Sequence, residues 1–78
     1  MLARDLSEIA REIRADWKRP YFGAVPYIEA LTMLHTMDDK YIYDDAKSIV
    51  LYFLSNAQSW RGETARRIKA ELKQMAGV

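Results

Sequence analysis

The residues best suited to binding chemistry are aromatic and cationic side chains in the second half of the chain. Tyr52 is followed by Trp60 and Arg61, and Arg66 comes shortly after them. Aromatic faces stack on bases or anchor protein contacts, and arginine pairs with phosphate through two hydrogen bonds. We therefore expect a ligand or partner site here. The candidate residues are Tyr21, Tyr27, Lys47, Tyr52, Asn56, Trp60, Arg61 and Arg66.

A structural role is the alternative for each aromatic residue. A chain this small has a thin core, and large rings fill such cores efficiently. We expect Trp17, Phe22 and Tyr27 to pack in the core or at a corner. For Tyr52 and Trp60 a packing role and a binding role both stay open.

The residues that support catalysis or metal binding are sparse. The single histidine, His35, precedes Asp38 and Asp39, but no further ligand follows at a known metal-site spacing. There is no cysteine, no serine in a Gly-x-Ser-x-Gly setting, and no glycine-rich phosphate loop. We therefore expect a protein that is not an enzyme and that holds neither a metal nor a cofactor.

The basic C-terminal segment suggests a different function. Its cations follow a short polar turn, as in a helix-turn-helix protein with a basic second helix. Glu63 and Glu71 dilute this charge, and the net charge of the whole chain is only +1. Binding to DNA is therefore the second hypothesis. The basic residues of the segment are Arg61, Arg66, Arg67, Lys69 and Lys73.

The composition describes one small domain, residues 1–78, with 50% hydrophobic residues. Small domains are commonly stabilised by disulfides, metals or partner subunits, and the absence of cysteine makes a homo-oligomer the remaining expectation. The charged residues are mostly acidic in the range 29–45 and mostly basic in the range 61–73. This difference permits an electrostatic contact between two copies of the chain. The longest apolar run, Ile49–Leu54, is too short to span a membrane, so we expect a cytoplasmic protein with no membrane partner.

The apolar spacing predicts an all-α fold, a compact bundle of four short helices. Leu2, Leu6, Ile9, Ile13 and Trp17 recur at three- and four-residue steps along one face of the first helix; a start near Leu6, with Asp5 in the cap, is the alternative to a start at residue 2. The third helix is the most hydrophobic, so we expect it at the centre. The predicted helices span residues 2–17, 26–37, 45–58 and 62–75.

The stretch RPYFGAVPY, residues 19–27, separates the first two predicted helices. Pro20 ends one helix and Pro26 fits the first turn of the next. Gly23 supplies backbone freedom between them, and we expect Tyr21, Phe22 and Tyr27 to hold this corner against the core. A tyrosine of this stretch is also expected to line a pocket with the turn at Trp60 and Arg61.

Two blocks of the sequence resemble a group of small uncharacterised proteins of prophages and integrative mobile elements. They are YFGAVPYIEAL, residues 21–31, and YDDAKSIVLYFLSNAQSWRGETARRIKAELK, residues 43–73. The resemblance implies an accessory protein acting in a host cell. Such proteins often antagonise host defences, either by sequestering a nucleotide immune signal or by blocking a defence protein. A regulator that binds DNA and a scaffold that only self-assembles are the competing hypotheses.

Overall fold

Four α-helices, one 3₁₀ turn and a short β-hairpin make up residues 3–78, the part of the chain that the computed structural model describes. The prediction of a mostly α fold with four short helices is confirmed, and the hairpin is an addition to it. The elements are α1 (Leu6–Asp16), η1 (Phe22–Ala24), α2 (Val25–Leu31), β1 (Lys40–Tyr41), β2 (Asp44–Asp45), α3 (Ala46–Ser55) and α4 (Glu63–Ala76).

Helix α1 begins at Leu6 because Asp5 caps it. The Asp5 carboxylate accepts hydrogen bonds from the Ser7 backbone N–H at 2.9 Å and from the Ser7 hydroxyl at 2.7 Å. An aspartate at this position satisfies an N–H group that has no partner within the helix. The alternative start near Leu6 is therefore the correct one. The predicted start at residue 2 lies outside the described residues.

Helix α2 is shorter than predicted and ends at Leu31 rather than near residue 37. The chain instead turns, because the Asp39 carboxylate accepts hydrogen bonds from the backbone N–H groups of His35 at 2.8 Å and Thr36 at 3.1 Å. A side chain that bonds nearby backbone groups competes with continuation of a helix. The apolar stripe that suggested a longer helix continues in Leu34, which is buried from within this turn.

The predictions for the last two helices agree with the structure to within three residues. Asp45 caps α3, because its carboxylate accepts from the Ser48 backbone N–H at 2.8 Å. Helix α3 ends at Ser55 rather than at residue 58, and Asn56 turns its side-chain amide back to the Tyr52 carbonyl at 2.8 Å. Helix α4 ends at Gly77, whose φ of 77° is the left-handed conformation typical of a helix terminator.

The hairpin of β1 and β2 pairs Lys40 with Asp45 and Tyr41 with Asp44. Ile42 and Tyr43 form its two-residue turn. Ile42 has φ 58°, a conformation in which hairpin turns normally place glycine or asparagine. The sequence lacks those turn residues, so the hairpin was not predicted.

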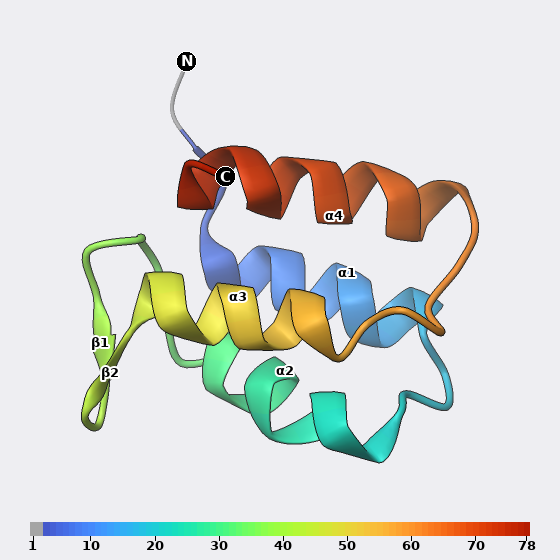
Figure 1. Ribbon diagram of the computed structural model, residues 1–78, viewed down its shortest axis with the longest axis horizontal. Helices are drawn as coiled ribbons and strands as arrows, with labels where there is room; N and C mark the ends of the chain where they lie inside the picture. The colour runs from blue at the N-terminus through green and yellow to red at the C-terminus, as the bar shows by residue number, and fades with distance from the viewer. Residues whose placement is uncertain (1–2) are drawn as a thin grey trace.

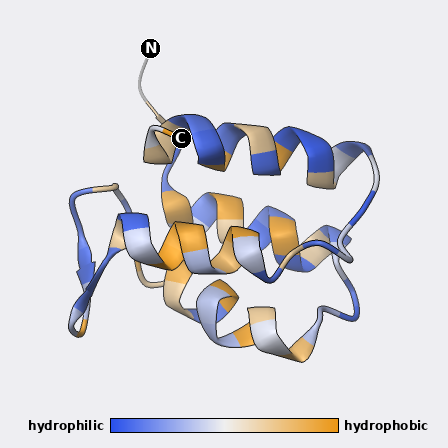
Figure 2. Cartoon of the chain, viewed as in Figure 1, coloured by the Kyte–Doolittle hydropathy of each residue, from blue (hydrophilic) through white to orange (hydrophobic). Residues whose placement is uncertain are grey.

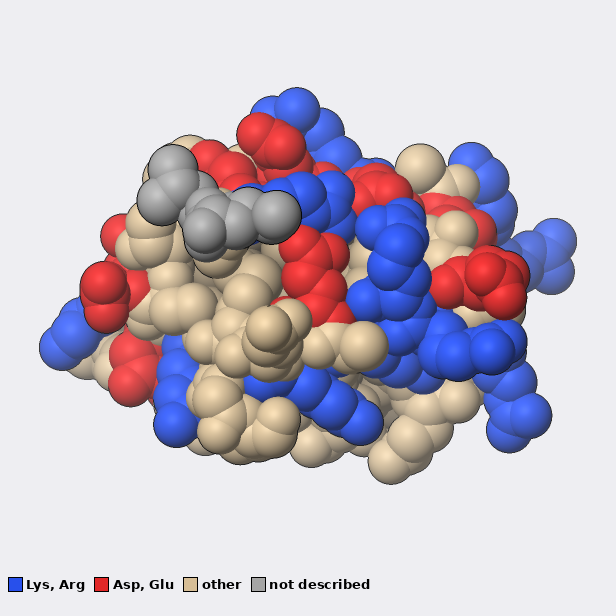
Figure 3. All heavy atoms as spheres, turned by 90° about the horizontal axis from the view of Figure 1, so that it is seen from above, with Lys and Arg blue, Asp and Glu red and all other residues tan. Residues whose placement is uncertain are grey.

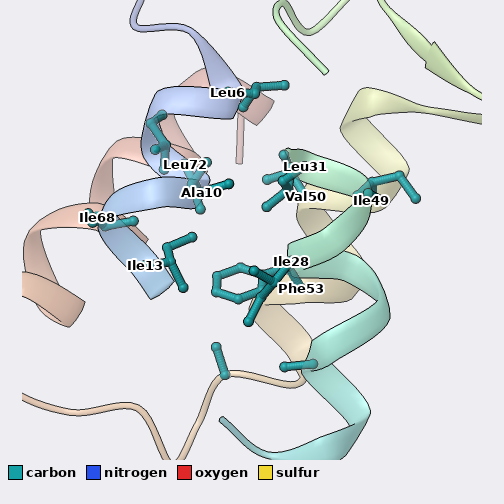
Figure 4. Close-up of a cluster of buried hydrophobic side chains, with 14 of the residues drawn as sticks. Leu6, Ala10, Ile13, Ile28, Leu31, Ile49, Val50, Phe53, Ile68 and Leu72 are labelled. Carbon is teal, nitrogen blue, oxygen red and sulfur yellow. The ribbon is translucent and has the colours of Figure 1, made fainter. Parts of the chain in front are cut away.

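Helix α3 packs on both α2 and α4, and α1 packs on the same two helices, so the central place expected for α3 is not particular to it. The four helices surround a shared core, and Figure 1 shows α4 above α3, α2 below it and α1 behind it. Apolar residues face this centre in Figure 2. Figure 4 shows side chains from all four helices meeting there, among them Leu6, Leu31, Phe53 and Leu72, all of which are fully buried.

Three aromatic rings close the core at one end. Trp17 stacks on Trp60 with ring centroids 5.6 Å apart and an angle of 11° between the ring planes. Phe53 meets both rings edge-on, at 6.4 Å and 6.2 Å. The Trp60 indole N–H donates to the Asp16 carboxylate at 2.8 Å, so the polar atom of this buried ring has a partner. The prediction that Trp17 packs in the core is confirmed.

The corner at residues 19–27 differs from the prediction. Phe22 is 79% exposed and Tyr21 is 46% exposed, so neither holds the corner against the core. The 3₁₀ turn buries Ala24 instead, and it leaves the Tyr21 and Phe22 rings against each other at 4.8 Å. Gly23 does not use the left-handed backbone freedom expected of it; a Cβ there would lie 2.6 Å from the Tyr21 ring and 2.9 Å from the Asn56 side-chain oxygen, so those side chains would have to shift.

Candidate functional site

A shallow depression on the surface of α4 is the candidate site. Its volume is about 460 Å³, within the roughly 300–1,000 Å³ of small-molecule sites. Four of its lining residues are cationic and the others are small or aromatic. They are Trp60, Arg61, Gly62, Ala65, Arg66, Lys69, Ala70 and Lys73.

The cations reach the depression because of helical spacing. Arg66, Lys69 and Lys73 follow one another at steps of three and four along α4, which places them on one face of the helix. Arg61 joins them from the loop that precedes α4. The Lys69 ammonium is held in place, since it donates to the Trp60 carbonyl at 2.6 Å and lies 5.9 Å from the centre of the Trp60 ring.

Positive charge is concentrated in this depression. Partial burial lowers the pKa of Lys69 below its ordinary value, and the nearby charges of Arg61 and Lys73 lower it further. Within residues 3–78, the ion pair on this flank of α4 is the one between Arg66 and Glu63, at 3.8 Å, and both of its side chains are largely exposed. An anion bound here would relieve repulsion among the cations.

The floor of the depression is built from small residues and from the edge of the core. Ala65 is buried, and Gly62 has φ 113°, a left-handed value that glycine adopts without strain. Trp60 is only 2% exposed, so its ring supports the floor and offers little surface for stacking. This geometry suits the binding of an anion over a small apolar surface.

The opposite flank of α4 carries charges that are already paired. Arg4 donates to both carboxylate oxygens of Glu71, at 2.8 Å and 2.7 Å, and to Glu12 at 2.7 Å. Arg67 donates to the other Glu12 oxygen at 2.6 Å. These bonds raise the pKa of Arg4 and lower the pKa values of Glu12 and Glu71. Figure 3, viewed from above, shows acidic side chains among the cations on this side of the molecule.

The eight candidate residues from the sequence do not form one cluster. Trp60, Arg61 and Arg66 line the α4 depression. Tyr21 and Asn56 line a second, less charged depression of about 340 Å³ together with residues 55, 58 and 59. The two groups lie on either side of the loop that joins α3 to α4.

The three remaining candidates lie elsewhere. The rings of Tyr27 and Tyr52 lie against each other at 5.4 Å, with Tyr27 half-buried on α2 and Tyr52 exposed on α3. Lys47 is exposed in the first turn of α3, where its charge helps to lower the pKa of Asp45. Within the described residues, neither Tyr21 nor Tyr27 lines the depression with Trp60 and Arg61, so the shared pocket predicted for them does not form.

Sequence reasoning left Lys69 and Lys73 out of the candidate site, although both were recognised as basic residues. The signal was available, because Arg66, Lys69 and Lys73 have the spacing of one helix face. Spacing alone could not distinguish these two lysines from Arg67, which is neutralised by Glu12. Glu12 lies on α1, far from Arg67 in the sequence.

His35 has a structural setting in this fold. Its Nδ1 lies 2.9 Å from the Asp5 carboxylate, which links the turn after α2 to the cap of α1. The hydrogen bond and the charge of Asp5 raise the pKa of His35 above its ordinary value. Within residues 3–78, no three side chains of histidine, cysteine, aspartate or glutamate gather as a metal site would require. The same residues contain no helix long and apolar enough to cross a bilayer.

Comparisons of the chain with protein-family models, with curated proteins and with solved structures give no match. A helical fold of this kind does not identify an activity by itself, because one fold supports many functions. Function is therefore inferred from the chemistry of the α4 depression and of the surfaces around it.

Proposed function

We propose that this protein is a non-enzymatic accessory binding protein that holds an anionic ligand in the α4 depression. The observation that carries the proposal is the set of cations around one hollow, with the Lys69 ammonium held by the Trp60 carbonyl. Keeping like charges together costs free energy, which a bound anion offsets. On the other flank of α4, Arg67 is paired with Glu12 of α1, so the remaining cations of this helix gather around the hollow.

A nucleotide is the ligand class that this depression suits best. Phosphate oxygens accept paired hydrogen bonds from arginine and single ones from lysine, and both donor types are present. The small apolar floor leaves room for a sugar or base edge above Ala65 and Ala70. Because Trp60 is buried, recognition would depend on phosphate and shape more than on stacking.

The resemblance to proteins of prophages and mobile elements supports a biological setting for this binding. In that setting the protein acts in the host cytoplasm and antagonises a defence system by sequestering a nucleotide immune signal. The alternative is that the same cations bind an acidic surface of a defence protein and block that protein.

Calorimetry with a cyclic dinucleotide, a mononucleotide and inorganic phosphate tests the proposal. We expect saturable binding of a nucleotide, with at least a tenfold loss of affinity in the double variant Arg66→Ala, Lys69→Ala, because charge-assisted hydrogen bonds to phosphate are lost. Arg11→Ala is the matched control, since Arg11 is an exposed cation on α1. A folded protein that retains none of these ligands would contradict nucleotide sequestration.

Binding to DNA is the second candidate, and the row of Arg66, Lys69 and Lys73 on one face of α4 favours it. Two features of the structure count against binding to DNA. Residues 56–62 join α3 to α4, a longer connection than the 3–4 residues that are typical of a helix-turn-helix. The two helices also run in opposite directions across Figure 1.

A mobility-shift experiment separates the two candidates. Binding through phosphates predicts that log K for duplex DNA falls linearly with log salt, by about 0.9 for each phosphate neutralised. If the double variant Arg66→Ala, Lys69→Ala removes such binding while nucleotides are not retained, the DNA hypothesis replaces the first one. An absence of any shift at low salt would eliminate it.

A further inference from the structure

The tip of the β-hairpin exposes two large apolar side chains. Tyr43 is 97% exposed and Ile42 is 75% exposed. Large hydrophobic residues exposed together on a projecting element are typical of interaction surfaces. Figure 1 shows the hairpin standing away from the helices at the end of the molecule where α3 begins.

The backbone of the tip is also unusual. Ile42 has φ 58°, which a β-branched residue adopts only at a cost, because its Cβ crowds the backbone. Glycine or asparagine would form the same turn without this strain. A strained residue that also exposes its apolar side chain gains nothing for the isolated fold, and this combination points to a role in contact with another molecule.

The hairpin that presents this tip carries acidic side chains. Asp44 and Asp45 form β2, and Asp38 precedes β1. Lys40 opposes them on β1, where it pairs with Asp45 in the register. All four of these side chains are exposed. A complementary surface would therefore combine a small apolar floor with cations at its rim.

The α4 depression has this chemistry. Its floor includes Gly62 and Ala70, and its rim holds Arg66 and Lys73. A tyrosine ring attracts guanidinium and ammonium groups through its π face, so Tyr43 suits a socket lined with cations. The carboxylates of β2 would reach the same cations as the tip enters.

The two surfaces do not meet within one molecule. Tyr43 is 97% exposed, and neither Ile42 nor Tyr43 lines the depression. Figure 1 shows the turn between β1 and β2 pointing away from α4. Contact between these two surfaces therefore requires two molecules.

We propose that the hairpin of one copy inserts Ile42 and Tyr43 into the α4 depression of a second copy. The contact is head-to-tail, because the two surfaces differ and belong to different elements of the fold. Head-to-tail contacts continue into open chains unless the rotation closes a ring. The contact covers the surface proposed for the anionic ligand, so the hairpin and the ligand compete, but the contact itself does not depend on which ligand binds.

The strength of this contact follows from its size. A hairpin tip buries less than the roughly 1,200 Å² per complex that stable interfaces need. We therefore expect a weak association, populated at hundreds of micromolar and weakened by salt because charge complementarity contributes to it.

Complementation between two variants tests the head-to-tail geometry by sedimentation velocity. One variant, Ile42→Gly with Tyr43→Ser, loses the tip and keeps the depression, and glycine tolerates the φ of the turn. The other, Arg66→Glu with Lys69→Glu, loses the socket and keeps the tip. The expected result is an average mass that rises with concentration for the unmodified protein, monomers for each variant alone, and a one-to-one dimer when the variants are mixed.

Several results would overturn this proposal. They are an unmodified protein that stays monomeric up to millimolar concentration, a mixture of the variants that stays monomeric, and assembly that survives in the socket variant, which would indicate a contact between two hairpins. Circular dichroism of each variant confirms folding before the comparison. The tip variant should still bind a nucleotide, so a failure of nucleotide binding and a failure of self-association are seen separately.

Discussion

On one flank of α4, Arg67 bonds to Glu12 of α1 and Glu71 receives two hydrogen bonds from Arg4. On the other flank, Lys69 and Lys73 lie around a hollow beside Arg66, whose acidic neighbour Glu63 is 3.8 Å away and largely exposed. Both flanks consist of the same residue types on the same helix. They differ in what is packed next to them.

The neighbouring element decides how each cation behaves. The paired flank faces α1, whose Glu12 accepts from Arg67, and the segment before α1, whose Arg4 donates to Glu71, so its charges are used within the fold. The flank around the hollow faces solvent, so its charges remain available to a ligand or a second copy. A basic residue on α4 therefore indicates binding only where the tertiary structure provides no carboxylate for it.

The largest effect is expected where the hollow rests on the core. Trp60→Ala removes a ring that stacks on Trp17 and leaves the Asp16 carboxylate without its donor. Truncation of a buried tryptophan costs about 3–5 kcal/mol, a large share of the stability of a small domain. Urea unfolding followed by circular dichroism measures the loss.

Tyr52→Ala is the control for this change, because Tyr52 is about half exposed. Its expected cost is about 1 kcal/mol, typical of a partly exposed contact. Equal losses for Trp60→Ala and Tyr52→Ala would show that Trp60 is not part of the core, and the hollow would then have a different floor.

The second prediction compares the stability lost on substitution of a cation at each flank of α4. Arg4→Ala should reduce the free energy of unfolding by about 1 kcal/mol, the upper end for ion pairs that are about one-third exposed and screened by water. Arg66→Ala should change it by less than about 0.5 kcal/mol, because Arg66 is largely exposed. The affinity for an anionic ligand should fall more in Arg66→Ala than in Arg4→Ala. A loss of stability in Arg66→Ala that equals the loss in Arg4→Ala would remove the distinction between the flanks.

A third prediction concerns pH and a charged pair outside both flanks. The pKa of His35 is raised, chiefly by its hydrogen bond to Asp5, so the folded state holds this proton more tightly than the unfolded state. The stabilisation is fully present below about pH 6.5 and is lost as pH rises through the raised value. The melting temperature should therefore fall modestly from about pH 6 to pH 8.

The contribution of Asp5 to stability changes with pH in the opposite direction to that of His35. The pKa of Asp5 is lowered from 3.8 to about 2, first by the Ser7 hydroxyl and then by His35. Its contribution is present above pH 3.8 and is lost as pH falls toward 2. Asp5→Asn is the sharp control, because asparagine also caps helices but carries no charge for His35. If the melting temperature of Asp5→Asn fell between pH 6 and 8 as much as that of the unmodified protein, a group other than His35 would be responsible.

The smallest expected effect comes from Glu63, the acid paired with Arg66 beside the hollow. Glu63→Gln removes a negative charge near Arg66 and should raise the affinity for an anionic ligand about twofold at low salt, a typical weight for exposed charges several ångströms apart. Calorimetry at two salt concentrations measures this change. A decrease in affinity would mean that Glu63 itself contacts the ligand.

Much of the helical framework follows from local sequence. The caps at Asp5 and Asp45 and the terminator at Gly77 act within a few residues of their own positions, so the starts of α1 and α3 and the end of α4 could be predicted. The end of α2 was missed because a carboxylate from Asp39 reaches back to residues 35 and 36. The hairpin was missed because its turn lacks the usual residues.

The candidate site could be predicted only in part. Three of the candidate residues, Trp60, Arg61 and Arg66, line the α4 depression, but the sequence grouped them with tyrosines that lie elsewhere. It also overestimated the surface that Trp60 offers, because the stacking partner Trp17 is distant in the sequence. Burial of a ring depends on such contacts, which residue spacing does not reveal.

By itself, the sequence determined that four helices form and where their capping residues lie, because periodicity and capping are interactions between near neighbours. It also determined the excess of positive charge on the C-terminal helix. The tertiary structure alone decided which of those charges are neutralised, which aromatic rings are buried, and that Ile42 and Tyr43 project into solvent. The physical reason is that pairing and burial are set by elements that lie far apart in the chain and meet only on folding.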